Sequence, residues 1–525
     1  MAIEAAPAAH AGAPAVTMND PQTPAGAPAP AAAPAGTWPG SHGLVLPPLE
    51  VGQVIDGFRL VERLHQGGMA YLWRVTHPDH PNLPLLMKVP RIKGGEDPAT
   101  IVGFEVEMML LPMIKGQHVP RFIAKGDFTT RPYIVMEHIP GDSLRPRLEA
   151  APLPIDEVAL IGARVATALH DLHRQHVIHL DIKPSNILFR PATDGSALGP
   201  AVLVDFGLSR HDHLPDLLDE EFNLPMGTGP YMSPEQVQFV RNEPRSDLFA
   251  LGVMLYHLTT GERPFGAPTS VRGLRERLYK EPVPPRVHRP DCPAWLQEII
   301  LRCLEVDASK RHPSAAHLAQ DLLNPQHIKL TARAEKAVQA GALQTFKRWF
   351  KAMGAEPSER GSAGEQLKRA PIIMAAVDVQ GATPALLDLV RETVQRILST
   401  EPGARLACVS VMKTARIGMD ELTDKQGNSV HVKQLVGLKH WARPISQALE
   451  LEDNRLTYHV LEAPDAAGAI VEFAQKTQVD HIIMGARGNS ALRRYLGSVS
   501  SQVVAQADCT VTVVRVPSEL AGASE

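Results

Sequence analysis

A short polar string in the first half of the chain contains the residue types needed to transfer a phosphoryl group. The string HLDIKPSN includes Asp181, Lys183 and Asn186, and a second string, DFG, begins at Asp205. Phosphoryl transfer needs a carboxylate that takes the acceptor's proton, a cation near the transferred group, and oxygen ligands for a metal ion. Asp181 and Lys183 suit the first two roles, while Asn186 and Asp205 offer the hard oxygen ligands that Mg²⁺ prefers. The order and spacing of the two strings make chance a remote explanation.

The elements that must position these residues can be read from the apolar pattern. Short apolar runs predict strands and longer runs with helical periodicity predict helices. The strands are expected at 133–136 and 201–204, and the helices at Glu157–His173 and Ser246–Thr260. Early strands followed mostly by helices indicate an α+β body that runs to about Asn324.

From about Val54 to Leu323 the chain resembles the protein kinase family, with its α+β bilobal fold, ATP as the phosphoryl donor and Mg²⁺ as the metal. Lys88, which ends the string LLMK, matches the strand lysine that holds the nucleotide phosphates. The resemblance implies Glu107 as its ion-pair partner, because Glu107 fits the family spacing better than Glu105 does.

The same resemblance assigns further positions. Met136 corresponds to the gatekeeper, and Glu137 and Ile139 to the hinge residues whose backbone groups bind adenine. The string GTGPYMSPE, which ends at Glu235, resembles the end of an activation segment. Arg311 is then expected to be the structural partner of Glu235.

The glycine-rich loop departs from the family pattern. Where the family has Gly-x-Gly-x-x-Gly, this chain has His65, Gly67, Gly68 and Ala70 at the relevant places. Glycines there let backbone amides approach phosphate closely. We expect Gly67 and Gly68 to contact ATP, and His65 and Ala70 to weaken or reshape the loop over it.

A second departure is Leu180, where most of the family has an arginine that binds an activation-loop phosphate. Between Gly207 and Gly227 the only hydroxyl is that of Ser209, and five acidic residues occur instead: Asp212, Asp216, Asp219, Glu220 and Glu221. The phosphate receptor and the phosphorylation site are thus missing together. We hypothesise that this kinase does not need phosphorylation of its activation loop.

Lys183, together with Thr228, resembles the serine/threonine branch of the family, and the form without regulatory inserts resembles its bacterial members. The resemblance implies protein substrates and allows autophosphorylation. One alternative is a pseudokinase scaffold, motivated by the altered glycine loop and Leu180. Small-molecule kinases share parts of the fold, although the string ending at Glu235 disfavours them.

Four histidines spaced by three, His170, His173, His176 and His179, suggest metal ligands at first sight. A spacing of three drifts around a helix of 3.6 residues per turn, and the last two lie beyond the expected helix end. The resemblance also gives His179 a bracing role beside Asp181. A metal site at these histidines is therefore the disfavoured interpretation.

A different pattern begins at Ala370. Strands are expected at 372–377, 404–411, 481–484 and 510–514, separated by helical stretches. Short apolar strands that alternate with helices are typical of a parallel, doubly wound sheet. Glycines at 485, 488 and 497 follow a strand and precede a helix, where backbone amides can surround phosphate.

With Asp378 at the end of the first strand, the region from about Ala370 to Val516 resembles the nucleotide-binding type of universal stress protein. The resemblance implies that Asp378 contacts the adenine end of ATP or a related nucleotide. It implies that ribose and phosphates are held by the following residues: Gly485, Gly488, Gly497 and Ser498. It also implies a homodimer.

The family places nine residues between Gly488 and the Gly-Ser pair, whereas this chain has eight. The alternatives are a dimerisation module with an altered pocket, in which glycine serves close packing, and a nucleotide-responsive stress sensor without transferase activity.

The segment joining the two regions contains one amphipathic stretch. Leu343, Phe346, Phe350 and Met353 share one helical face, with Trp349 beside them. The interleaved basic residues are Lys347, Arg348 and Lys351, and they permit binding to a membrane surface. We favour a helix that docks on a neighbouring domain and ends at Gly354, because one short basic cluster is weak support for membrane binding.

Composition sets the remaining expectations. The 525 residues carry a formal net charge of −4, which argues against a charge-driven grip on nucleic acid. There is neither a run of 18 apolar residues nor a secretion signal, and four dispersed cysteines indicate reduced thiols, so we expect a cytoplasmic protein without a transmembrane segment. The predicted parts are a disordered Ala/Pro-rich arm (1–48), the kinase domain (49–325), a helical connector and linker (326–369), with a flexible tether at 356–366, the stress-protein-like domain (370–517) and a tail (518–525).

Overall fold

The computed structural model describes ten stretches of the chain, all within one compact unit, Trp38–Glu525. They are residues 48–66, 70–92, 97–192, 197–339, 341–353, 370–401, 403–414, 429–452, 455–486 and 498–516. The predictions of a disordered arm, a tether at 356–366, a helix stop at Gly354 and a tail at 518–525 lie outside these stretches, apart from residue 48. Within the stretches, no helix has the length and apolar character needed to cross a bilayer.

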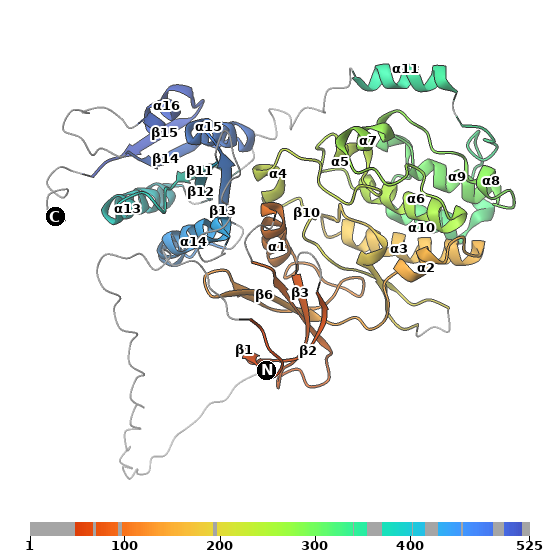
Figure 1. The fold of residues 1–525 in the computed structure, drawn as a ribbon, viewed down its shortest axis with the longest axis horizontal. Helices are drawn as coiled ribbons and strands as arrows, with labels where there is room; N and C mark the ends of the chain where they lie inside the picture. Colours follow the sequence, from red (N-terminus) through yellow and green to blue (C-terminus); the bar gives the residue numbers. More distant parts are fainter. Residues whose placement is uncertain are drawn as a thin grey trace, which may run out of the picture. The chain divides into compact units, whose positions relative to one another are not determined.

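The first lobe is a six-stranded antiparallel sheet with the order β1-β2-β3-β4-β6-β5 and one helix (Figure 1). Its strands are β1 (Val54–Ile55), β2 (Phe58–Gln66), β3 (Ala70–Thr76), β4 (Leu85–Pro90), β5 (Phe122–Asp127) and β6 (Arg131–Glu137). Helix α1 (Pro98–Leu110) starts where the Asp97 carboxylate accepts a hydrogen bond from the Ala99 amide, with proline at the first helical position. The strand expected at 133–136 is confirmed within β6.

The second lobe is mostly helical. Its helices include α2 (Arg145–Glu149), α3 (Ile155–His173), α4 (Leu217–Glu221), α5 (Pro234–Val237), α6 (Arg245–Thr260), α7 (Val271–Arg275), α8 (Pro285–His288), α9 (Ala294–Cys303) and α10 (Ala315–Leu323). Its short strands are β7 (Val177–Ile178), β8 (Ile187–Phe189), β9 (Ala201–Leu203) and β10 (Arg210–His211). Helix α6 is buried along nearly its whole length. The predictions for 157–173, 201–204 and 246–260 are confirmed to within two residues.

The C-terminal region is a five-stranded parallel sheet with the order β13-β12-β11-β14-β15. The strands are β11 (Ile372–Ala376), β12 (Arg405–Lys413), β13 (Leu456–Ala463), β14 (His481–Gly485) and β15 (Thr510–Val514). The predicted doubly wound sheet is confirmed. The sequence analysis missed β13, because Thr457, His459 and Glu462 interrupt its apolar pattern.

Alternating side chains of this sheet face two different layers of helices. Ile373 and Ala375 belong to the core formed with α13 (Pro384–Thr400) and α14 (Val430–Leu449). Met374 and Ala376 belong to the core formed with α15 (Ala466–Thr477) and α16 (Ser498–Gln506). The period of two along β11 thus produces a three-layer α/β/α domain.

Helix α11 (Ala342–Met353) follows the helical lobe and exposes its apolar face. Leu343, Phe346 and Phe350 are 79%, 61% and 67% exposed. Arg348 pairs with Glu281 near η3 (Glu276–Leu278). The predicted docking on a neighbouring domain is thus made through a charged side chain, and the apolar face is exposed.

Three of the four cysteines are buried and none forms a disulfide, as expected. Burial raises the pKa of the Cys303 thiol to about 12, so it remains protonated at neutral pH.

Candidate active site

Three charged residues from three separate elements meet in the first two lobes. Lys88 on β4 donates from Nζ to Glu107 Oε2 at 2.5 Å and to Asp205 Oδ1 at 2.8 Å. Glu107 lies on α1 and Asp205 follows β9. Glu105, two residues earlier on α1, pairs instead with Lys439. The strand lysine, the helix carboxylate and the aspartate of the DFG string thus form one ion-pair network.

The network fixes the charge states of its members. Burial disfavours the charged form of Lys88, but the attraction of Asp205 and Glu107 outweighs burial and raises its pKa. The Lys88 ammonium lowers the pKa of Asp205 to about 2 against the opposing effect of burial. An ammonium and an ionised aspartate therefore stand side by side at neutral pH.

Helix α1 reaches this network through a glycine. A Cβ added at Gly103 would lie 3.0 Å from the Gly207 carbonyl oxygen, so the helix and the DFG string are in direct backbone contact. Gly103 and Glu107 are four residues apart and share one helical face. Close approach at Gly103 therefore lets Glu107 reach Lys88.

A second polar cluster surrounds the Asp181 carboxylate. Lys183 Nζ donates to Asp181 Oδ2 at 2.6 Å, and Asn186 Nδ2 donates to the Asp181 carbonyl oxygen at 3.0 Å. Thr228 donates to Asp181 Oδ1 from its hydroxyl at 2.6 Å and from its backbone N–H at 3.1 Å. Asp181, only 6% exposed, is thus held as an oriented hydrogen-bond acceptor.

The loop that carries Asp181 is braced by Asp247 of α6. Its carboxylate accepts the backbone N–H groups of His179 and Leu180, both at 2.9 Å, and the His173 ring nitrogen at 2.8 Å. Burial would raise the pKa of Asp247, but these donors outweigh burial and lower it. Leu180 has φ of 61°, a left-handed conformation that the two bonds to Asp247 help to hold.

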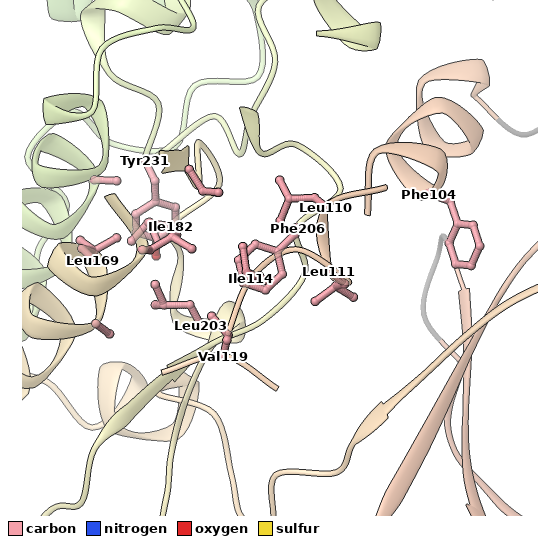
Figure 2. Packing of buried hydrophobic residues seen from close by; sticks show 14 of the residues in the cluster. Phe104, Leu110, Leu111, Ile114, Val119, Leu169, Ile182, Leu203, Phe206 and Tyr231 are labelled. Atoms are coloured by element: carbon pink, nitrogen blue, oxygen red, sulfur yellow. The ribbon is translucent and has the colours of Figure 1, made fainter. Parts of the chain in front are cut away.

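Figure 2 shows the buried apolar side chains around Phe206, the middle residue of the DFG string. In this view Phe206 lies close to Ile114 and to Leu110, the last residue of α1, and Ile182 of the Asp181 loop belongs to the same buried cluster. Its ring centroid is 5.1 Å from that of His179. The residue between Asp205 and Gly207 therefore packs against both α1 and the Asp181 loop.

The hinge residues lie at the end of β6 and just after it. Met136 and Ile139 are buried, and Glu137 forms a bidentate pair with Arg190. The Arg190 hydrogen bond lowers the pKa of Glu137 against the effect of burial. Adenine-binding roles for these three residues stay predictions.

The end of the activation segment is anchored by Arg311, which is fully buried. Its guanidinium donates to Glu235 Oε1 at 2.6 Å and to Oε2 at 2.9 Å. In the place where the family has arginine, Leu180 is 3% exposed and its carbonyl oxygen accepts Gln236 Nε2 at 2.7 Å. The side chain of Leu180 therefore makes no hydrogen bond to this segment, and Arg311 holds it instead.

The four spaced histidines have different partners. His173 bonds Asp247, His176 lies 3.7 Å from Asp212, and His179 contacts the Val204 carbonyl oxygen. In the stretches that the structure describes, no group of three or more histidines, cysteines or acidic residues is placed to hold a metal ion.

Two oxygen donors fit a Mg²⁺ ion beside Asp181. Asp205 uses Oδ1 for Lys88, and its side chain is 41% exposed, so part of the carboxylate is open to a ligand. Asn186 turns its amide nitrogen toward Asp181, and its amide oxygen accepts the Ser185 hydroxyl at 3.2 Å, which leaves one lone pair of that oxygen for a cation. The predicted contacts of Gly67 and Gly68 with ATP lie outside the described residues.

In the C-terminal domain the candidate residues lie at one end of the sheet. Asp378 follows β11 and accepts the Gly381 amide at 2.8 Å, while Gly485 ends the neighbouring strand β14. Strand order reverses between β11 and β14, and ligands of doubly wound sheets bind at such a reversal. Ser498 begins α16, whereas Gly488 and Gly497 lie outside the described residues.

Gly485 also has a packing role. A Cβ added there would lie 2.9 Å from Leu386 Cδ2 of α13. Close packing, one of the alternatives for this glycine, therefore accounts for the residue type at 485 without a ligand.

The two polar clusters lie in a two-lobed fold that is followed by a separate α/β/α domain. Comparison with known families identifies both. Residues 87–323 match the protein kinase domain and residues 371–515 match the universal stress protein family. The chain thus carries a protein kinase domain and a C-terminal universal stress protein domain, as the sequence resemblance implied.

Bacterial proteins are similar to the kinase part. A probable serine/threonine-protein kinase PknB of Lactococcus lactis is 25% identical over 277 residues, which cover 52% of this chain and 43% of that protein. The serine/threonine-protein kinase pkn2 of Myxococcus xanthus is 30% identical over 284 residues, which cover 53% of this chain and 34% of that protein. The chain therefore spans less than half the length of these relatives.

A solved structure of the PknI kinase domain of Mycobacterium tuberculosis is also similar, at 23% identity. It matches 53% of this chain and 100% of that domain with a TM-score of 0.41.

Sequence reasoning did not name Thr228 among the site residues, although the hydroxyl and N–H of Thr228 both contact Asp181. The signal was present, since Thr228 opens the Thr-x-x-Tyr part of the activation-segment string. It was read only as a mark of substrate class.

Proposed function

We propose that this protein is an ATP-dependent serine/threonine protein kinase. The observation that carries the proposal is the convergence of Lys88, Glu107 and Asp205, next to an Asp181 carboxylate oriented by Lys183 and Thr228. A scaffold without transferase activity would not need these groups to be so arranged. The names of the bacterial relatives support the same activity and substrate class.

In the proposed reaction each residue has one task. Asp181 accepts the proton of the substrate hydroxyl as its oxygen attacks the terminal phosphorus of ATP and the bond from that phosphorus to the bridging oxygen breaks, which releases ADP; Lys183 offsets the negative charge that develops on the transferred group. Lys88, oriented by Glu107, binds the nucleotide phosphates. Met136, Glu137 and Ile139 border the adenine, and Gly67 and Gly68 cover the phosphates.

Asn186 and Asp205 would hold the metal. A bound Mg²⁺ ion neutralises phosphate charge and orients the leaving group. The low pKa of Asp205 suits this task, because its carboxylate stays ionised over the whole neutral range.

The C-terminal domain has two proposed roles, binding of ATP or a related nucleotide and pairing into a homodimer. The position of Asp378 and Gly485 at the strand-order reversal supports the first. For the second, β15 forms a sheet edge that pairs only with β14 among the described strands. A cytoplasmic location, protein substrates and autophosphorylation complete the proposal.

Transfer of radiolabelled phosphate from ATP tests the kinase proposal. The full chain is incubated with Mg-ATP and a generic protein acceptor, beside Asp181→Ala. We expect labelling of serine or threonine by the wild type and none above background by the variant. Equal labelling of both, or ATP binding without any labelling, would favour the scaffold alternative instead.

A further inference from the structure

The acidic helix of the activation segment, α4, has two buried faces. Leu217 and Leu218 pack against Val102 and Val106 of α1, the helix that carries Glu107. The Asp216 carboxylate caps the helix and binds Arg241 Nε at 2.8 Å, so the N-terminal end of α4 is fixed within the kinase domain. Glu220 and Glu221 lie on the other face, and they are only 12% and 3% exposed at the side chain.

The C-terminal domain supplies the partners of that second face. Arg405 at the start of β12 donates to Glu220 in a bidentate pair at 2.7 and 2.6 Å. His459 of β13, fully buried, bonds Glu221 at 3.0 Å. Lys476 of α15 donates to the Phe222 carbonyl oxygen at 3.1 Å, where it satisfies the C-terminal end of α4. Three elements of one domain therefore bind one short helix of the other.

Only one of these side-chain pairs carries opposite charges. Burial lowers the pKa of His459 well below its usual value, so its ring is neutral at neutral pH, and burial raises the pKa of Glu221. Arg405 and Glu220 are then the ion pair of this helix, and the Arg405 guanidinium is also held by Thr457 Oγ1 at 2.9 Å. A fork-to-fork pair of this kind is strong and directional.

A second ion pair joins the same two domains, and its kinase-domain residue lies on α1. Lys439 of α14 binds Glu105 of α1 at 2.7 Å and lies 4.4 Å from the Tyr458 ring centroid. Glu105 and Glu107 stand on the same helix, α1, two residues apart. The C-terminal domain thus contacts both α4 and the helix that positions Glu107 next to Lys88.

We propose that Arg405 is a positioning residue for the kinase domain, binding Glu220 in the way that an arginine binds an activation-loop phosphate. In this chain the carboxylate replaces the phosphate and the C-terminal domain provides the arginine that Leu180 cannot. The pair holds α4 against α1 and thereby keeps Glu107 beside Lys88. This inference rests on the proposed kinase function and adds a structural role for the C-terminal domain.

A double-mutant cycle on the full chain tests the pair. Arg405→Gln and Glu220→Gln remove the charges with little change of volume, and Arg396→Gln, an exposed arginine on α13, is the matched control. We expect each single variant to lower kcat for phosphate transfer by about 5- to 50-fold, a common range of coupling between sites. The double variant should lose about as much as either single one, and Arg396→Gln should stay within about twofold of wild type.

Arg405→Lys adds a readout that a purely structural role would not produce. Lysine keeps the positive charge but cannot form the two parallel hydrogen bonds of a guanidinium. We therefore expect Arg405→Lys to have a kcat between those of Arg405→Gln and the wild type, with KM for ATP nearly unchanged. Additive losses in the double variant, no loss in Arg405→Gln, or a gain of activity would each overturn the proposal. A gain would mean that docking inhibits the kinase.

Hydrogen exchange of the full-length variants separates this proposal from the proposed function. In Arg405→Gln we expect the amides of α4 to exchange about tenfold faster, while those of β11 and α6 keep their protection and show that both domains remain folded. Unchanged exchange in α4 would overturn the positioning role even if the wild type is an active kinase. If the wild type transfers no phosphate, faster exchange in α4 still supports docking through Arg405, while the kinase function fails.

Discussion

The two domains hold their candidate nucleotide-binding residues by different means. In the kinase domain, side chains of β4, α1 and the loop after β9 bind one another directly in the pairs of Lys88 with Glu107 and with Asp205, and Asp181 of the loop after β7 binds Thr228. In the C-terminal domain, Asp378 bonds the backbone of its own loop, and Gly485 is placed by helix packing on Leu386. The kinase site is a network of mutually bonded charged side chains, whereas the C-terminal site is defined by where its residues lie at the end of the sheet.

Because of this difference, the two sites respond differently when a single side chain is changed. An interlocked set loses its geometry when a single charge is removed, because the remaining partners are left buried and unpaired. A site formed by sheet topology keeps its backbone when one side chain changes, so its residues can vary while the fold remains. Ligand binding in the C-terminal domain therefore needs its own measurement.

The largest expected difference is between two aspartates. Asp181→Asn removes the proton acceptor and should lower kcat by about 10³-fold, within the usual range for general-base catalysis. Asp378→Asn in the other domain should change kcat by less than about threefold. Initial rates of phosphate transfer with saturating Mg-ATP measure both, and a large loss in Asp378→Asn would show that the C-terminal site governs transfer.

The next effect is on stability. Arg311→Ala leaves Glu235 with an unpaired carboxylate in a mostly buried position, and we expect the kinase domain to lose about 3 kcal/mol of unfolding free energy. Urea unfolding followed by tryptophan fluorescence measures it. Arg396→Ala, at an exposed position on α13, is the control and should change stability by less than about 0.5 kcal/mol.

A smaller effect concerns pH and the Lys88 network. The pKa of Asp205 is depressed in the folded chain to about 2, so its contribution to stability is present above the unfolded pKa of about 4 and is lost as pH falls toward 2. Lys88→Met removes the ammonium group that is the main cause of the depressed Asp205 pKa. The difference in unfolding free energy between wild type and Lys88→Met should narrow on acidification by about 1 kcal/mol, because the partly exposed carboxylate is screened by solvent.

Denaturant titrations of both proteins at pH 6 and pH 3 make this comparison. A difference that stays constant over that range would mean that Lys88 does not depress the pKa of Asp205.

The smallest effect tests the packing role of Gly485. In Gly485→Ala the new Cβ meets Leu386 Cδ2, and we expect a loss of about 1 kcal/mol confined to the C-terminal domain, with phosphate transfer within twofold of wild type. Hydrogen exchange of β14 reports the local loss. Adding Leu386→Ala should relieve the crowding at 485, so the cost of the alanine at 485 should be smaller in that background.

Much of the fold and most of the kinase site could be predicted from the sequence, since local strings encode them. Apolar runs marked β11, β12, β14 and β15, and the spacing of Asp181, Lys183 and Asn186 marked the Asp181 loop. Those patterns depend on neighbours within a few residues, which a sequence displays directly.

Features that depend on distant parts of the chain were missed. Strand β13 carries His459 in the middle of its apolar pattern, and the reason is a carboxyl group 238 residues away, Glu221. The sequence alone gives no sign that Arg405 differs from an ordinary surface arginine, because its partner Glu220 is distant in the chain. Amphipathicity predicted that α11 docks on a neighbouring domain, but it did not predict that Arg348 makes the contact while the apolar face is exposed.

Mass spectrometry of the purified full chain after incubation with Mg-ATP tests the proposed chemistry most directly. With Lys88, Asp181, Asn186 and Asp205 acting on one nucleotide, the wild type should gain mass in increments of about 80 Da, one for each phosphoryl group, on serine or threonine side chains, and Asp181→Asn should gain none in the time in which the wild type gains its first. If the wild type stays unmodified and also fails to phosphorylate an added protein acceptor, or if Asp181→Asn is modified equally, these residues do not form a phosphotransfer site.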